Sequence, residues 1–157
     1  MNVLPQGRTL VIGVGNADRG DDAIGLLVAR QIAQMGLPGV TVVEAAADGT
    51  ELMEIWTGAR SAIIIDAVHG YGNPGTIYRF DAGSSAIPAK SFRHSTHGFS
   101  LGDGIELSRV LNQLPNRLIV YGIVGTDFDL GSGISSSVGA AAREVAPRVV
   151  QELRDAQ

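Results

Sequence analysis

The chain has 157 residues, with 12 lysines and arginines against 16 aspartates and glutamates, and it contains no cysteine. At roughly 100–200 residues per domain the length predicts one domain over residues 1–157, and it excludes an eightfold barrel of roughly 250 residues. The absence of cysteine excludes disulfides, thiolate metal sites and a cysteine nucleophile. A formal net charge of -4 argues against nucleic-acid binding, because no basic field would attract phosphates.

Neither the apolar runs nor the first residues predict membrane insertion. The longest apolar runs, 10–14 and 62–65, are far shorter than the roughly 20 residues that a membrane span needs. Residues 1–9 carry no apolar stretch with a cleavage site of the kind found in signal peptides. We therefore expect a cytoplasmic protein, and its small size and single domain lead us to expect a monomer.

Short β-rich runs alternate along the chain with helical periods, which is typical of a layered α/β domain. The expected strands cover residues 9–14, 40–44, 61–66, 76–80 and 117–124. The expected helices cover residues 22–35, 49–56, 99–114 and 138–153, and Pro147 should kink or interrupt the last one. This pattern predicts a three-layer α/β/α sandwich around a mainly parallel, twisted sheet of about five strands. The alternating run 76–80 suits one antiparallel edge strand.

Acidic residues follow the predicted parallel strands, at the edge where open α/β sheets bind their ligands. The glycine-containing loop 13–22 follows the first strand, Glu44 ends the second, and Asp66 comes directly after the apolar run of the third. Asp21 and Asp22 also open the first predicted helix, where carboxylates are common caps. We expect one of the two to point into the crevice. Asp66 is either a site residue or a hydrogen-bond acceptor for a neighbouring loop amide.

Other motifs, present or absent, limit the kinds of ligand and reaction that the sequence supports. Asp18 stands where a dinucleotide loop of the form G-x-G-x-x-G has its third glycine, and its carboxylate would face the pyrophosphate. Phosphate-binding G-x-x-x-x-G-K-[ST] loops and G-x-S-x-G nucleophile elbows do not occur. His69, His94 and His97 lie in predicted loops, where a lone histidine is usually solvated. Two aspartates and one histidine converging on a crevice would instead offer donors for nickel, zinc or another divalent ion.

A series of motifs occurs in a fixed order along nearly the whole chain. They are Gly13-Val14-Gly15-Asn16, the acidic segment 20–25, residues 48–52, Ile65-Asp66-Ala67, Pro74-Gly75-Thr76 and Ser95-Thr96-His97. In this order and at this spacing they resemble the endopeptidases that mature nickel-iron hydrogenases by removing the C-terminal extension of the large subunit.

The resemblance implies a set of site residues. The metal-contacting and catalytic positions of the family fall on Asp22, Asp66 and His97, so the resemblance selects His97 over the other two histidines. The supporting positions fall on Asp21, Glu44 and Asn16. A carboxylate that is not a metal ligand, Asp21 or Glu44, would take the proton from an attacking water.

The resemblance also implies the substrate, a nickel-iron hydrogenase large-subunit precursor that carries nickel and is cut once near its C-terminus. The expected activity is that of a metal-dependent or aspartic-type endopeptidase. Nickel would come with the substrate, and zinc or cadmium could replace it in a purified sample. Two alternatives remain open at this point: a nickel-binding chaperone without peptidase activity, and a module that binds a nucleotide or another small ligand at the glycine loop.

Overall fold

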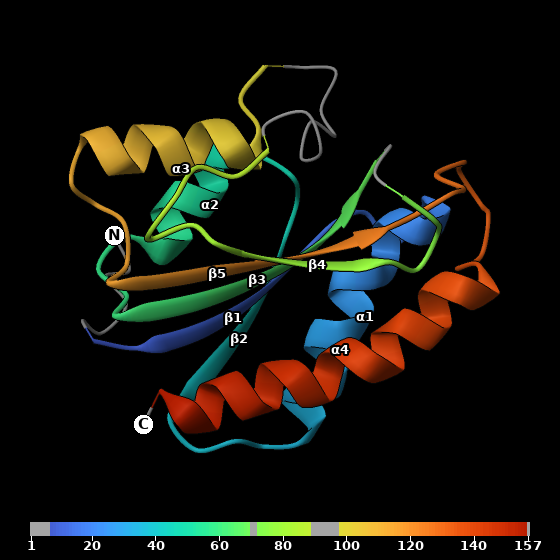
Figure 1. The fold of residues 1–157 in the computed structure, drawn as a ribbon, viewed down its shortest axis with the longest axis horizontal. Helices are drawn as coiled ribbons and strands as arrows, with labels where there is room; N and C mark the ends of the chain where they lie inside the picture. Colours follow the sequence, from blue (N-terminus) through green and yellow to red (C-terminus); the bar gives the residue numbers. More distant parts are fainter. Residues whose placement is uncertain (1–6, 70–71, 89–97, 157) are drawn as a thin grey trace.

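The computed structural model describes residues 7–69, 72–88 and 98–156. Five strands form one sheet in the order β2-β1-β3-β5-β4 (Figure 1). They are β1 (Thr9–Val14), β2 (Val40–Ala45), β3 (Ser61–Val68), β4 (Ile77–Asp81) and β5 (Arg117–Val124). The first three and β5 are parallel, whereas β4 runs antiparallel to β5 at the edge. The predicted sheet, with its antiparallel edge strand, is confirmed.

Helices cover both faces of the sheet (Figure 1). The helices α1 (Ile24–Gln34) and α4 (Ser136–Asp155) pack on one face, and α2 (Gly49–Trp56) and α3 (Leu101–Val110) pack on the other. A short 3-10 helix, η1 (Gly20–Ala23), leads into α1. Each face has its own apolar core, so the strands between them are apolar on both sides. No helix in the described ranges is long and apolar enough to cross a membrane.

Strand β3 is longer than predicted, and this changes the position of Asp66. Ala67 and Val68 continue the parallel pairing with Ile123 and Val124 of β5 and are buried. The strand does not end at the acidic residue, because the apolar residues beyond it find a paired strand and a covered surface. Asp66 therefore lies inside β3, two residues before its end, rather than at the last position of the strand.

Two helices begin or end elsewhere than predicted. Asp21 and Asp22 belong to η1, and α1 begins only at Ile24. The helix α3 begins after a capping box between Ser100 and Asp103, and it is shorter than residues 99–114. It ends before Asn112, whose φ of 56° is left-handed and cannot continue a helix.

The last helix, α4, is not interrupted at Pro147, where a kink or an interruption was predicted. Pro147 lies inside it and on its exposed side. The backbone carbonyl that loses its hydrogen bond there can be hydrated, which lowers the cost of a proline within a helix.

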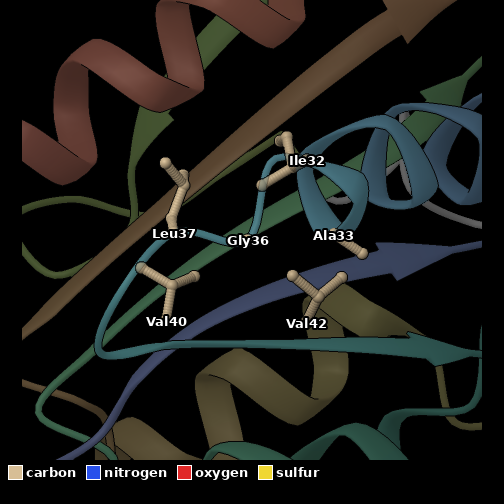
Figure 2. A pocket seen from close by; sticks show the side chains of 6 residues that line it. All are labelled: Ile32, Ala33, Gly36, Leu37, Val40 and Val42. Carbon is tan, nitrogen blue, oxygen red and sulfur yellow. The ribbon is translucent and has the colours of Figure 1, made fainter.

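A small apolar hollow of about 240 Å³ lies between the end of α1 and the beginning of the edge strand β2 (Figure 2). It is lined by Ile32, Ala33, Gly36, Leu37, Val40 and Val42. These side chains offer neither acid, base nor metal ligand. Open α/β sheets bind their ligands at the opposite, carboxyl end of the parallel strands.

Candidate active site

The connection between strands changes direction at β1 and β3. From β1 the chain continues to β2 on one side, and from β3 it continues toward β5 on the other. Such a switch point is where open α/β sheets bind ligands, because the connecting loops diverge there. Asp22 follows β1, and Asp66 lies near the end of β3, so the switch point has one of the two predicted acids on each side.

Close backbone approach keeps η1 and α1 against this edge. A Cβ atom on Gly25 would lie 2.2 Å from the carbonyl oxygen of Ile65 and 2.5 Å from that of Val14. A Cβ atom on Gly15, whose φ is +153°, would lie 1.9 Å from the carbonyl oxygen of Asp22. Only glycine allows these contacts. They hold the segment with Asp22 beside the ends of β1 and β3.

Asp22 is half-buried and faces a hollow. Its Oδ2 accepts a hydrogen bond from the Asn16 backbone N–H at 3.0 Å, and the Asn16 Oδ1 accepts one from the Asp18 N–H at 2.9 Å. Asn16 thus supports Asp22 through its backbone while its side chain shapes the turn. The hollow measures about 490 Å³ and is lined by Gly15, Asn16, Ala17, Asp18, Arg19, Asp22, Ala46 and Ala47.

Asp66 is fully buried. Side chains alternate between the two faces of a strand, so Asp66 shares its face with Ile64 and Val68. Both of these residues belong to the core under α2 and α3. The carboxylate of Asp66 therefore points to the side of the sheet that α2 and α3 cover.

Asp21 is also fully buried, but it has a different environment. Its Oδ2 accepts from the backbone N–H groups of Thr126 (2.9 Å) and Asp127 (3.1 Å), and its Oδ1 accepts from that of Ser135 (2.8 Å). The Ser135 hydroxyl lies 3.0 Å from both oxygens. Burial alone would raise the pKa of the Asp21 carboxyl, but these donors outweigh it and lower the pKa. Asp21 thus joins η1 to the loop after β5.

Glu44 is not one of the described residues that line the hollow beside Asp22. It is exposed, and its two carboxylate oxygens accept from the guanidinium of Arg30 on α1, at distances of 2.8 to 3.1 Å. The hydrogen bonds and charge of Glu44 raise the pKa of Arg30. Both acids that the sequence offers as proton acceptors, Asp21 and Glu44, are therefore already bound to other groups.

The histidines are less fully described. His94 and His97 lie outside the described residues, whereas His69 is exposed and its ring stacks on Phe128 with 3.9 Å between centroids. The described chain resumes after His97 at the carboxyl edge, where the Gly49 N–H donates to the Phe99 carbonyl at 2.9 Å. Within the ranges that the structure describes, no group of three or more histidine, cysteine or acidic side chains could hold a metal ion.

The loop after β5 contributes partners that sequence reasoning did not single out. Ser135 and Thr126 bind Asp21, and Phe128 contacts the His69 ring. The only sequence signal for them is the glycine- and serine-rich composition of residues 125–137 at the end of a predicted strand. Composition of this kind predicts a loop but does not identify its partner.

Comparison with known proteins identifies the family. The sequence model of HycI, hydrogenase maturation protease, matches residues 26–152. This chain belongs to the hydrogenase maturation protease family. The resemblance seen in the sequence motifs is thereby confirmed.

Individual members of the hydrogenase maturation protease family match over most of their length. The hydrogenase 2 maturation protease of Escherichia coli is 28% identical over 152 residues, covering 94% of this chain and 92% of that protein. HybD of Thermococcus kodakarensis, a [NiFe] hydrogenase maturation protease of known structure, is 26% identical with a TM-score of 0.68, over 93% and 98% of the two chains. The E. coli endopeptidase HybD, 24% identical, shares the fold with a TM-score of 0.79 over 95% and 93%.

Proposed function

We propose that this protein is an endopeptidase that removes the C-terminal extension from a nickel-loaded large-subunit precursor of a nickel-iron hydrogenase. The observation that carries the proposal is the family match, which spans residues 26–152. The match does not favour the two alternatives, a nickel-binding chaperone and a nucleotide-binding module. We expect the protein to act as a cytoplasmic monomer.

Asp22, Asp66 and His97 are the residues that we assign to contact the nickel of the substrate. The two acids flank the switch point of the sheet, and the described chain just after His97 reaches the same edge. Carboxylate and imidazole donors suit nickel, and equally zinc or cadmium. Because Asp66 is fully buried, its contact with a substrate metal requires the surrounding chain to open. A precursor without nickel would lack this anchor and would not be cut.

Cleavage in this proposal is hydrolysis of one peptide bond. The oxygen of a water molecule adds to the scissile carbonyl carbon, the C–N bond breaks, and the leaving amine receives a proton. When held by Asp22, Asp66 and His97, the substrate's nickel would polarise the scissile carbonyl. We do not assign the proton acceptor to Asp21 or Glu44, because hydrogen bonds already engage both oxygens of each carboxylate.

A processing assay with purified precursor tests the proposal. Wild-type protein should cut the nickel-loaded precursor once and leave the nickel-free precursor intact. Asp22→Asn and His97→Gln should each lower kcat/KM by about hundredfold or more, since even the loss of a residue that only supports a metal ligand commonly costs about 10- to 100-fold. The product mass, measured by mass spectrometry, locates the cleaved bond.

Two control variants show whether the loss of any carboxylate charge, or of any histidine ring, would have the same effect on processing. Asp129 is an exposed carboxylate in the loop after β5, and Asp129→Asn should process at the wild-type rate. His94→Gln should do the same if His97 is the histidine that matters. Cleavage of the nickel-free precursor, or full activity of His97→Gln, would overturn the assignment of nickel recognition.

A further inference from the structure

Half of the residues that line the hollow beside Asp22 are small. The loops after β1 and β2 form its walls, and Gly15, Ala17, Ala46 and Ala47 contribute no bulky side chain to it. Its volume of about 490 Å³ is twice that of the apolar hollow at the other end of β2. A substrate whose nickel lies against Asp22 must place a neighbouring stretch of its chain in or over this space.

Arg19 is one of the residues that line the hollow, and hydrogen bonds hold its backbone in place. The Arg19 backbone N–H donates to the Asn16 carbonyl at 3.3 Å, and the Arg19 carbonyl accepts from the Asp22 N–H at 3.0 Å. The Arg19 side chain is exposed, and within the described ranges no hydrogen bond or ion pair engages it. Its planar guanidinium therefore keeps its donors available to a ligand.

Several other arginines of the protein differ from Arg19 because their guanidinium groups form ion pairs. Arg30, Arg109 and Arg148 are each paired with a glutamate on the surface. Arg143 on α4 is exposed and, like Arg19, has no ion pair with any described residue, but it does not line the hollow. Arg19 thus combines an available guanidinium with a place beside the candidate site.

We propose that Arg19 is a specificity-determining residue that binds an acidic side chain of the substrate close to the cleaved bond; this rests on the proposed function. A carboxylate accepts two parallel hydrogen bonds from a guanidinium, which gives direction as well as charge attraction. Among the described residues that line the hollow, the other charges are those of Asp18 and Asp22. With Asp22 engaged by the substrate's nickel, Arg19 attracts a nearby carboxylate, and Asp18 opposes it.

The experiment is a charge swap between enzyme and substrate. Nickel-loaded precursors are prepared in which each of the first positions after the cleaved bond is in turn Glu, Gln or Lys, and kcat and KM are measured separately. At one position the wild-type protein should prefer Glu over Lys by about tenfold, mainly through KM, because the contact contributes to substrate binding. Arg19→Gln should abolish this preference, and Arg19→Glu should invert it.

Two further variants sharpen the test. Asp18→Asn removes the opposing charge from the same hollow and should increase the preference for Glu. Arg143→Gln removes a matched exposed arginine and should change neither kcat nor KM. Thermal unfolding of the Arg19 variants should match the wild type, since the side chain makes no contact that folding needs.

The outcomes separate this inference from the function on which it rests. If the wild-type protein cuts every loaded precursor equally well, or if Arg19→Glu keeps the preference for Glu, the role of Arg19 is refuted while the endopeptidase function stands. If the wild-type protein cuts no loaded precursor, the endopeptidase function and the role of Arg19 both fall.

Discussion

Asp21→Asn tests how the carboxyl edge of the sheet is held together. The substitution keeps the size of the side chain but replaces one carboxylate oxygen by an NH₂ group. If the nitrogen takes the place of Oδ2, it faces the N–H groups of Thr126 and Asp127. If it takes the place of Oδ1, it faces the N–H group of Ser135. In either orientation, the NH₂ group of the asparagine faces at least one backbone N–H group, and neither can accept a hydrogen bond from the other.

The orientation that loses only the Ser135 amide bond is the less costly one. A buried donor left without an acceptor costs about 1–3 kcal/mol, and each of the two remaining amide bonds loses roughly 1 kcal/mol when the acceptor becomes neutral. The free energy of unfolding should therefore fall by about 3 kcal/mol or more. With a slope of roughly 2 kcal/mol per molar urea, the unfolding midpoint should fall by about 1.5 M.

Urea unfolding at pH 7, followed by circular dichroism, measures this difference. Asp129→Asn is the matched control, because Asp129 is an exposed carboxylate of the same loop, and its change should stay within about 0.5 kcal/mol. A loss below about 1 kcal/mol in Asp21→Asn would refute the bookkeeping, since that is the least a single unsatisfied buried donor costs.

A second check is the pH dependence of the difference in unfolding free energy between the wild type and Asp21→Asn. The pKa of Asp21 is lower in the folded protein than its ordinary value of about 3.9. The unfolded chain therefore binds the proton first as the pH falls, and the carboxylate's contribution is present above about pH 4 and lost as the pH falls through the folded-state pKa. The gap between wild type and Asp21→Asn should be constant from about pH 5 to 8 and shrink in stronger acid.

Three further predictions concern residues packed around the sheet. Gly25→Ala places a Cβ atom 2.2 Å from a carbonyl oxygen of β3, so it should cost about 2–3 kcal/mol in urea unfolding, whereas overpacking that relaxes freely would cost almost nothing. Trp56→Phe removes the buried indole N–H that donates to the Ser108 hydroxyl at 3.0 Å, and it should cost about 1–3 kcal/mol, with Ser108→Ala as the partner variant in a double-mutant cycle. Burial and the hydrogen bond to Glu152 raise the pKa of Tyr121 to about 12, so ultraviolet titration of wild type minus Tyr121→Phe should show a tyrosinate midpoint near that value rather than near 10.

The sequence predicts the sheet well because the decisive signals are local. Continuous apolar runs identify β1, β3 and β5 as strands covered on both faces, and alternation identifies β4 as an edge strand. Parallel strands bring their carboxyl ends to one edge, so Asp22 and Asp66 could be expected beside the same crevice. The side of the sheet that Glu44 faces was also predictable. It shares the alternation of Val40 and Val42, which pack toward α1.

Other features depend on contacts between distant segments. The length of β3 follows from its pairing with β5, which allows Ala67 and Val68 to extend the strand beyond Asp66. The role of Asp21 depends on donors 105 to 114 residues further along the chain. No local pattern distinguishes Asp21 from Asp22, although one is bound to a loop and the other faces a hollow.

The hydrogen bonds of Asp21 have a mechanical consequence. They join the segment after β1 to the loop after β5, two strands that are both neighbours of β3 and not of each other. These hydrogen bonds therefore connect the two segments across the end of β3. The two segments lead into α1 and α4. The hydrogen bonds brace the two strands on either side of Asp66 without covering the face toward which that carboxylate points. Because the Asp66 carboxylate points toward α2 and α3, a ligand that reaches it is expected to enter from that side of the sheet.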